Sequence, residues 1–492
     1  MFKKLLLTAA LFFLAHAAVA QTDSQKTALA TIDPLFEAYM RDNHVPGLVF
    51  GVVMDGKLAY VRGLGVQDIK TRTPVTQDTV FRIASMSKNF TALAALKLRD
   101  EGKLSLDMPA ELYIAELAAL RYPTSDSARI TVRDLLSHSA GFVNDDPWGD
   151  RQLAMSEADF SRLLKGGVPF SRSPGQAYEY SNFGYALVGR LVTNVSGRNY
   201  ADYITASFLN PLGMTSTRYD LAKVPAGRRA IGYRWEGYAW IEEPVLGPGV
   251  FGAMGGVMTT ASDYARFIAW QLAAWPPRDE PEDGILKRAS IREIQRPGTY
   301  AIVIPGANPS DRPRSASYGM GVNLSYDCVL GFSFGHSGGL PGYGSNMLML
   351  RDRGVGIFAF TNRTYAGPST AVRQAAIQLV KSGAFPLKPT PPSQGLQAMA
   401  PIVAKIYAAG DVLAAPEALA MNVLLDRDAA QRNSQIAVLK KTLGACGAAN
   451  PINSDSAMSA TLTYPCEHGT LRARVALAPT IPASLQTLDF QP

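Results

Sequence analysis

A serine and a lysine three positions apart are the first candidates for chemistry in this chain. Ser85 and Lys88 would lie one helical turn apart, on the same face, if this segment is helical. A hydroxyl is a weak nucleophile at its free pKa, and a partly desolvated lysine beside it can take its proton. A chain of this length should contain roughly one such pair by chance. The pair therefore predicts a serine nucleophile only if its context agrees.

The residues after Ser85 predict a helix that begins near it. Residues 90–98 are apolar and include good helix formers, and Gly102 follows as a stop signal. The free N–H groups and the positive end of a helix favour an alkoxide or a tetrahedral oxyanion at Ser85. The alternative is that Ser85 only caps the helix.

Two further segments supply groups that could act on the same substrate. Tyr180 and Asn182 stand between a turn signal at 173–175 and an apolar stretch at 183–189, so they are expected in a loop that enters a helix. A phenol there could relay protons, although a nearby cation would have to lower its pKa of about 10 before it acted as a base.

The other segment is His336-Ser337-Gly338-Gly339, which follows the strand-like residues 331–334. Its glycines allow the backbone to approach a bound ligand closely.

These three motifs, in this order, resemble those of the serine β-lactamase and penicillin-binding-protein superfamily, in its branch of class C β-lactamases, D-amino-acid-specific peptidases and related esterases. The resemblance covers about residues 45–381 and includes framework segments at 135–142 and 255–260. It implies a mixed α and β fold of the β-lactamase/transpeptidase type, with an antiparallel sheet flanked by helices and a mostly helical subdomain.

The resemblance also implies roles for individual residues. Ser85 would be the nucleophile, and Lys88 and Tyr180 the proton-transfer pair, with the identity of the base left open. Asn182 would donate to the substrate amide or contact Lys88. The N–H groups of Ser85 and Gly339 would form the oxyanion hole.

The third motif departs from the common pattern, because most members of the family have lysine where this chain has His336. Ser337, Gly338 and Gly339 are expected to line the substrate site with it. At pH 7 an unperturbed imidazole is mostly neutral and offers one donor and one acceptor. It suits an amine, an ester or an uncharged leaving group, and a carboxylate only at mildly acid pH. Strong penicillin hydrolysis is therefore not expected. The alternative is a His336 whose ring is satisfied within its strand.

The other histidines predict no catalytic or metal site. His138 lies in a framework segment, which favours a structural role such as bonding a nearby loop. His44 and His468 have no supporting partners. Without a H-E-x-x-H motif or paired cysteine spacing, neither a metal nor a cofactor is expected. Aromatic residues at 233–240 predict a hairpin, and residues 144–150 an exposed loop; either could border a cleft.

The first twenty residues predict an export signal. Lys3 and Lys4 precede an apolar run at 5–15, and the small residues Ala18 and Ala20 fit a cleavage site. The alternative is an uncleaved anchor. Removal of residues 1–20 lowers the formal net charge from +7 to +5, without a basic cluster that would favour nucleic acid. A periplasmic or secreted protein with no later membrane span is expected.

A proline-rich stretch at 385–394 predicts a linker between a hydrolase domain at 21–384 and a small α+β domain at 395–492. In the first domain, residues 45–65 predict a hairpin, and strands at 345–350 and 355–360 would flank the third motif. In the second, helices are expected at 396–409, 416–425 and 429–443, followed by strands at 457–464, 470–477 and 485–490.

The cysteines fit this division of the chain. Cys446 and Cys466 both lie in the small domain, so they are the expected disulfide pair in an oxidising compartment. Cys328 is then left over, and nothing near it suggests activation.

Three classes of function follow from these observations. The favoured class is an exported serine hydrolase that forms an acyl-enzyme on Ser85 and cleaves an ester or a D-amino-acid amide or peptide. The first alternative is a β-lactamase or a penicillin-binding DD-peptidase that acts on cell-wall peptide. The second is a binding or sensing module without catalysis. In each case the partner would be a small molecule or a peptide, possibly derived from the cell wall.

Overall fold

The computed structural model describes residues 21–278, 280–300, 302–306 and 313–492. The predicted export signal at 1–20 lies outside these residues. The chain divides into two compact units, one of Met1–Ala273 with Gly284–Pro386 and one of Ala274–Asp283 with Leu387–Pro492. Within the described residues, no helix combines the length and hydrophobicity needed to cross a membrane.

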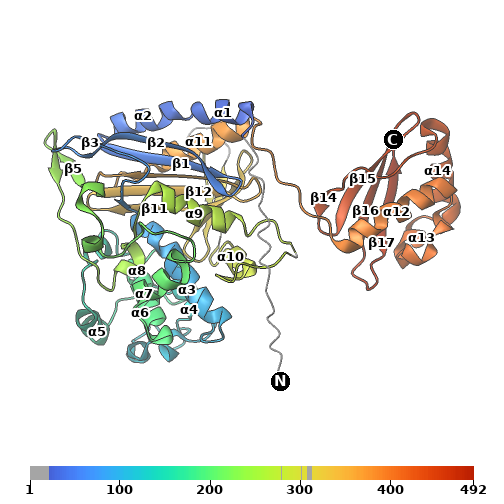
Figure 1. Cartoon of the computed structure of the whole chain (residues 1–492). Helices are drawn as coiled ribbons and strands as arrows, with labels where there is room; N and C mark the ends of the chain where they lie inside the picture. The colour runs from blue at the N-terminus through green and yellow to red at the C-terminus, as the bar shows by residue number, and fades with distance from the viewer. Residues whose placement is uncertain (1–20, 279, 301, 307–312) are drawn as a thin grey trace, which may run out of the picture. The chain divides into compact units, whose positions relative to one another are not determined.

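A nine-stranded antiparallel sheet organises the first unit (Figure 1). The order of its strands is β3 (Thr73–Pro74), β2 (Lys57–Asp68), β1 (Gly47–Met54), β13 (Val355–Thr361), β12 (Tyr343–Leu350), β11 (Gly331–Leu340), β10 (Asn323–Asp327), β9 (Arg314–Tyr318) and β8 (Ile302–Ile304). The hairpin expected at 45–65 is β1 and β2, whose turn residues Asp55 and Gly56 both have positive φ, as an Asp-Gly turn requires.

Helices cover both faces of this sheet. Helices α1 (Asp23–Ala30), α2 (Asp33–Asp42) and α11 (Ser369–Lys381) pack on one face, in a core that includes Phe36, Phe50 and Val372. Helix α9 (Ala261–Leu272) packs on the other, where the Tyr264 ring contacts Phe358 and Phe360. Strand β1 is accordingly buried at every position, which explains its continuous apolar sequence.

A mostly helical region adjoins the sheet and carries two of the three motifs (Figure 1). Its helices are α3 (Ser87–Asp100), α4 (Val132–Ser137), α5 (Glu157–Lys165), α6 (Asn182–Ser196), α7 (Tyr200–Ile204), α8 (Gly252–Gly255) and α10 (Arg288–Glu293). Strand β4 (Phe81–Arg82), which leads into the first motif, pairs with β7 (Met258–Thr259). The described architecture confirms the predicted β-lactamase/transpeptidase type of fold.

The third motif lies where strand β11 runs past the end of its neighbour. Strand β10 pairs with β11 only as far as Gly335, so among the described strands none continues the pairing along this edge from His336 onward. A Cβ at Gly338 would lie 2.4 Å from the Ile83 carbonyl oxygen and 2.3 Å from Ser345 Oγ. Only glycine therefore lets this strand approach the backbone just before Ser85.

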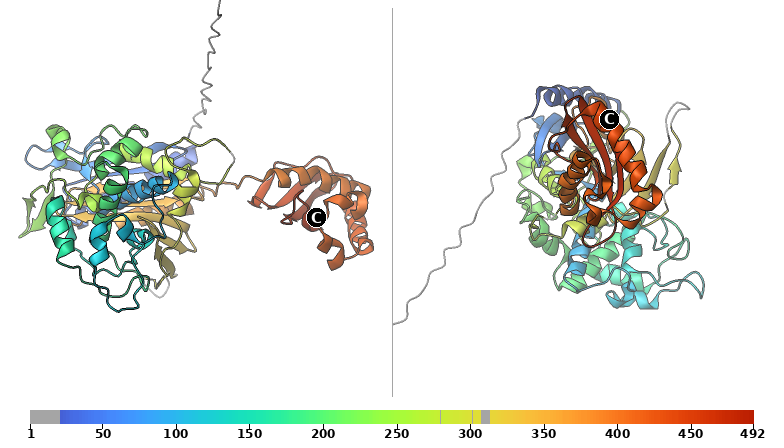
Figure 2. Two further views of the ribbon diagram at one scale, coloured as in Figure 1. Left: turned by 90° about the horizontal axis from the view of Figure 1, so that it is seen from below. Right: turned by 90° about the vertical axis from the view of Figure 1, so that its right-hand side faces the viewer.

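The second unit contains a four-stranded antiparallel sheet of β14 (Asn453–Ser456), β15 (Ser459–Cys466), β16 (Gly469–Leu477) and β17 (Leu485–Gln491). Helices α12 (Gln394–Ala409) and α14 (Ala429–Leu443) pack against it around an apolar core (Figure 2). The single helix expected at 416–425 is instead a short 3-10 turn (Pro416–Ala418) followed by α13 (Met421–Asp426). Strand β14 is short and polar, and the sequence pattern did not predict it.

The expected disulfide between Cys446 and Cys466 is confirmed, and Cys328 is a free, exposed cysteine.

Candidate active site

The first motif folds as expected around the start of α3. Ser85 lies in a 3-10 turn (Ala84–Met86) that leads directly into the helix, and it does not cap the helix with its side chain. Lys88 lies in the first helical turn, with Nζ 3.0 Å from Ser85 Oγ. Ala84 has a φ of 49°, in the left-handed region that costs a residue with a Cβ about 1 kcal/mol. Such strain is typical of functional sites.

The second motif brings two more groups to this pair. The Tyr180 hydroxyl donates to Ser85 Oγ at 2.8 Å, and Asn182 Oδ1 accepts a hydrogen bond from Lys88 Nζ at 2.7 Å. Ser181, between them, caps α6 by accepting from the Gly184 N–H at 3.0 Å. The start of α6 thus fixes the positions of both neighbours.

Burial makes Lys88 a better candidate for the base than a solvent-exposed lysine would be. The side chain is fully buried, and Nζ also lies 3.1 Å from the Met254 carbonyl oxygen. Desolvation lowers the pKa of Lys88 to about 8, and the nearby carboxylates of Asp150, Asp146 and Asp145 oppose this shift. Near neutral pH a usable fraction of Lys88 is therefore the free amine.

Tyr180 responds in the opposite direction. The residue as a whole is half-buried, but its phenol group is buried. This burial raises the pKa of Tyr180 well above its ordinary value, and the hydrogen bond to Ser85 opposes the shift only in part. Its hydroxyl keeps its proton across the neutral range. The geometry therefore favours Lys88 as the proton acceptor and Tyr180 as a donor or relay.

His138 supports the second motif from behind. It ends α4 in a left-handed conformation, and its Nδ1 accepts from the Ser181 N–H at 3.1 Å. Its ring packs 4.5 Å from those of Tyr180 and Tyr318, centroid to centroid. Desolvation lowers the pKa of His138 well below its ordinary value, so the ring is neutral. These contacts are those of a positioning residue.

His336 lies in the cleft wall, but its ring is committed to the protein. Nδ1 lies 2.5 Å from the Ser337 carbonyl oxygen, which can only accept, so Nδ1 carries the proton. Nε2 then accepts from the Tyr318 hydroxyl at 3.0 Å. Desolvation and the positive charge of Lys88 lower the pKa of His336 to about 3. Both ring nitrogens are therefore already hydrogen-bonded to the protein, so neither is free for the expected contact with substrate. With a pKa of about 3, the ring also stays uncharged at mildly acid pH.

Three aspartates in the loop before the second motif belong to the site, although the sequence pattern indicated only an exposed loop that could border a cleft. Asp145 accepts from the N–H groups of Asn182 and Phe183, both at 2.7 Å, at the start of α6. Asp146 Oδ1 accepts from Asn182 Nδ2 at 2.5 Å. Asp150 is buried, which together with Asp146 raises its pKa to about 7 against the opposing effect of Lys88. The signal in the sequence that could have indicated these residues is a run of aspartates directly after the framework segment at 135–142.

Ser85 opens into a cleft of about 570 Å³, here called the Ser85 cleft. It is lined by Ser85, Asp146, Pro147, Asp150, Tyr178, Tyr180, Asn323, His336, Ser337, Gly338, Gly339 and Tyr365. The structure therefore brings together all eight residues of the three motifs that the sequence singled out. The hairpin expected at 233–240 is β5 (Tyr233–Glu236) and β6 (Ala239–Glu242), but its Trp235 stacks on His44 and lies outside this lining.

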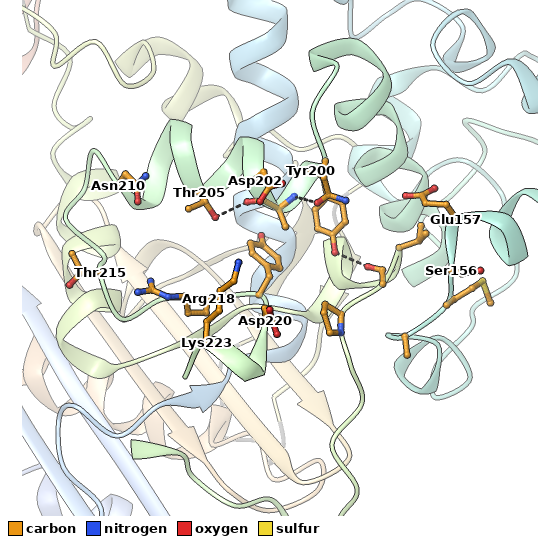
Figure 3. A pocket seen from close by; sticks show the side chains of 18 residues that line it. Ser156, Glu157, Tyr200, Asp202, Thr205, Asn210, Thr215, Arg218, Asp220 and Lys223 are labelled. Atoms are coloured by element: carbon orange, nitrogen blue, oxygen red, sulfur yellow. Dashed lines mark hydrogen bonds between the residues drawn. The ribbon is translucent and has the colours of Figure 1, made fainter. Parts of the chain in front are cut away.

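A larger hollow of about 700 Å³ lies elsewhere in the first unit (Figure 3). This Tyr200 hollow is lined by Ala154–Glu157, Asn199–Asp202, Thr205, Asn210, Thr215, Arg218–Asp220, Lys223 and Pro248–Val250. None of the predicted site residues lies in it. Across the described residues, no group of three or more His, Cys, Asp or Glu side chains could hold a metal ion.

Comparisons with known proteins agree with this arrangement. The family model described as Beta-lactamase matches residues 32–382. "Protein flp" of Staphylococcus aureus is 28% identical over 337 residues, which are 67% of this chain and 62% of that protein. "Beta-lactamase-like protein 2" of Dictyostelium discoideum is 27% identical over 366 residues, 72% of this chain and 62% of that protein. The chain thus spans about 62% of the length of these relatives.

Among solved structures, the octameric penicillin-binding protein homologue from Pyrococcus abyssi superposes with a TM-score of 0.58 and 20% identity, over 94% of this chain and 95% of that one. At this identity the match speaks for the fold alone.

Proposed function

Since the chain belongs to the Beta-lactamase family, we propose that it is a serine hydrolase that forms an acyl-enzyme on Ser85 and transfers the acyl group to water. The observation that carries this proposal is the convergence of Lys88 Nζ and the Tyr180 hydroxyl on Ser85 Oγ, at 3.0 and 2.8 Å. A nucleophile within hydrogen-bonding reach of its base is the arrangement that covalent catalysis requires.

In the acylation step, Ser85 Oγ bonds to the substrate carbonyl carbon while the free amine of Lys88 takes the hydroxyl proton. The tetrahedral oxyanion is held by the N–H groups of Ser85 and Gly339, each worth a few kcal/mol at the transition state. Its collapse breaks the bond to the leaving group, which takes a proton from the Lys88 and Tyr180 pair. Water then attacks the carbonyl carbon of the acyl-enzyme ester and gives a proton to the pair. Collapse of this second tetrahedral intermediate breaks the bond to Ser85 Oγ, which takes that proton, and releases the acid.

The proposed substrate is an ester or a D-amino-acid amide or peptide of small size. Its class is supported by the lining of the Ser85 cleft, in which His336 is neutral and has no free ring nitrogen. A β-lactam or a wall peptide that ends in a carboxylate would find no cation on His336. Action on such substrates is the alternative that the relatives' names suggest, and it is an outcome of the test below.

We also propose that the protein works outside the cytoplasm. The support is the signal-like sequence at 1–20, together with a disulfide between Cys446 and Cys466, since disulfides persist mainly in oxidising compartments.

The proposal is tested with a panel of acylating probes read by intact mass and by turnover. The panel contains a 4-nitrophenyl ester, a D-alanine 4-nitroanilide and a fluorescent penicillin. We expect a transient acyl adduct and turnover of the ester or the anilide, both absent in Ser85→Ala. Stoichiometric labelling by the penicillin without ester turnover would favour the penicillin-binding alternative. A wild-type protein that no probe acylates would indicate a module without catalysis.

A further inference from the structure

We propose that the Ser85 cleft selects substrates that carry a cationic group, such as an amine, and that Asp146 and Asp150 recognise this group. The inference deepens the proposed function and rests on it for the position of the scissile bond. It assigns a charge class to the substrate and a specificity role to two residues that the catalytic steps do not use.

The charges on the cleft wall point in one direction. Of the described residues that line the Ser85 cleft, two are carboxylates and none is lysine or arginine. Lys88 lies behind Ser85, fully buried, and its Nζ already serves three oxygen acceptors. Arg151 acts on the charge of Tyr365 but does not itself line the cleft. The charge on the lining near neutral pH is therefore that of Asp146 and of the ionised fraction of Asp150, whose pKa is raised to about 7 by burial and by Asp146.

His336 cannot compensate for this charge, because its imidazole stays neutral. A lysine at this position would instead be a permanent cation. The ring donates to the Ser337 carbonyl oxygen and accepts from Tyr318. A substrate carboxylate would lie near like charges and find no cation on the wall, an arrangement that disfavours a partner of that charge.

The two carboxylates are held in place by the catalytic framework. Asp146 accepts from Asn182, which also contacts Lys88, so it lies two hydrogen bonds from the base. A Cβ at Gly149 would lie 2.7 Å from Asn182 Cβ and 3.0 Å from Asp145 Oδ2, so glycine is what lets the loop lie this close. Asp150 follows directly and lies beside Tyr365 in the cleft lining.

The two aspartates differ in position and exposure, so they would contact a substrate cation at different stages of binding. Asp146 is exposed and can meet a substrate cation as it enters, whereas Asp150 is only 4% exposed and lies in the wall. A carboxylate has about four lone-pair sites, so one hydrogen bond from the protein leaves acceptor capacity for an ammonium group. A cation between them would also reduce the repulsion between the two carboxylates.

The test compares two esters of the same shape and different charge. They are the 4-nitrophenyl esters of 4-(trimethylammonio)butyrate and of 5,5-dimethylhexanoate, in which a neutral tert-butyl group replaces the cation. After correction for spontaneous hydrolysis, we expect wild-type kcat/KM to be at least about tenfold higher for the cationic ester, as one partly desolvated charge pair would give. The ratio between esters cancels changes in the catalytic groups that affect both equally.

Variants assign this preference to residues. In the double variant Asp146→Asn with Asp150→Asn, the ratio should fall to within about twofold of unity, with each single variant between. Asp202→Asn, which removes the same charge in the Tyr200 hollow, is the matched control and should keep the wild-type ratio. A wild-type ratio near or below unity, or a ratio that the double variant leaves unchanged, overturns the inference.

The failure of this inference is distinguishable from failure of the proposed function. Hydrolysis of the neutral ester that disappears in Ser85→Ala, without any charge preference, refutes the selectivity and leaves the hydrolase. If neither ester is turned over, binding of the two corresponding carboxamides to Ser85→Ala by calorimetry decides the matter. Tighter binding of the cationic amide supports the inference, and equal affinities overturn it.

Discussion

The Ser85 cleft and the Tyr200 hollow are both lined with serine, tyrosine and acidic residues, but their polar groups point differently. In the hollow they bond to the backbone: the Tyr200 hydroxyl donates to the Gly249 carbonyl oxygen at 2.7 Å, and Asn199 caps α7. In the cleft an amine and a phenol from separate segments meet on the one oxygen of Ser85. The hollow is the larger, so volume alone does not identify a site of reaction.

The difference lies in how far apart in sequence the converging groups are. In the hollow, the contacts of Asn199 and Asp220 are made two residues along the chain, and the contact of Tyr200 with Gly249 spans 49 residues. The contact between Tyr180 and Ser85 spans 95 residues, and that between Lys88 and Asn182 spans 94. A helix cap stabilises the fold by bonding a backbone N–H that would otherwise lack a partner. Burial of a lysine costs free energy, so a buried lysine indicates a use other than stability. Matched substitutions in the two regions test this distinction.

The largest effect is expected from removal of the nucleophile. Ser85→Ala should lower ester turnover by at least about 10⁴-fold, because it removes the hydroxyl on which the proposed acyl-enzyme forms. The matched change in the hollow, Ser156→Ala, removes a cap of α5 and should cost about 1 kcal/mol of stability without changing turnover. Steady-state rates and thermal melts of both variants are compared. Equal rates in the two variants would contradict the distinction between the cleft and the hollow.

Removal of the buried amine should have the next largest effect. Lys88→Met should reduce kcat/KM by roughly 10³-fold through loss of the base. It should also lower the melting temperature, because Asn182 Oδ1 and the Met254 carbonyl oxygen lose a donor. Lys223→Met in the hollow removes an exposed lysine, with an expected effect on stability within about 0.5 kcal/mol. A Lys88→Met protein with wild-type kcat/KM would contradict its role.

The phenol of the cleft should contribute less than the amine. Tyr180→Phe keeps the ring against His138 and removes only the hydroxyl at Ser85, so kcat should fall by about 10²-fold. Tyr200→Phe loses the hydrogen bond to Gly249, worth about 1 kcal/mol of stability, and should retain wild-type kcat. Pre-steady-state rates of acylation and deacylation would show which step the phenol serves.

The smallest effect concerns pH. Since the pKa of Lys88 is about 8, wild-type kcat/KM for a neutral ester should rise with pH and level off above that value. The Asp150 carboxylate stabilises the ammonium form and so raises the pKa of Lys88. Asp150→Asn should therefore move the rising limb to lower pH, by less than about one unit. Asp202→Asn should leave the profile in place, and a shift to higher pH in Asp150→Asn would contradict the assigned electrostatics.

The sequence predicted the elements of the fold well where the pattern was local. The hairpin turn at Asp55 and Gly56, the apolar helix after Ser85 and the glycine-rich strand at His336 each have signals within a few residues. The same holds for the strands and long helices of the second unit. The helix expected at 416–425 is broken because Leu419 forms a bridge with Leu485 and the Ala420 N–H donates to the Leu485 carbonyl oxygen. Strand β14 was missed because its short polar sequence takes its structure from pairing with β15 rather than from propensity.

Two residues show where sequence reasoning stopped. His336 was expected to be free for substrate, yet Tyr318, eighteen positions earlier, takes its second nitrogen. Asp150 was expected in an exposed loop, yet it is buried in the wall of the cleft. The structural role expected for His138 is confirmed, because its Nδ1 accepts from the N–H of Ser181, next to Tyr180.

Sequence by itself determined which groups could react, because hydroxyl, amine, phenol and imidazole are properties of residue types, and their order along the chain is specific enough to indicate a family. Only the tertiary structure decided which form those groups take. Protonation and hydrogen-bonding capacity depend on burial and on neighbours within a few ångströms, and those neighbours come from distant parts of the chain. Hence burial lowers the pKa of the Lys88 amine, Ser337 and Tyr318 occupy both ring nitrogens of His336, and Asp146 and Asp150 line the cleft.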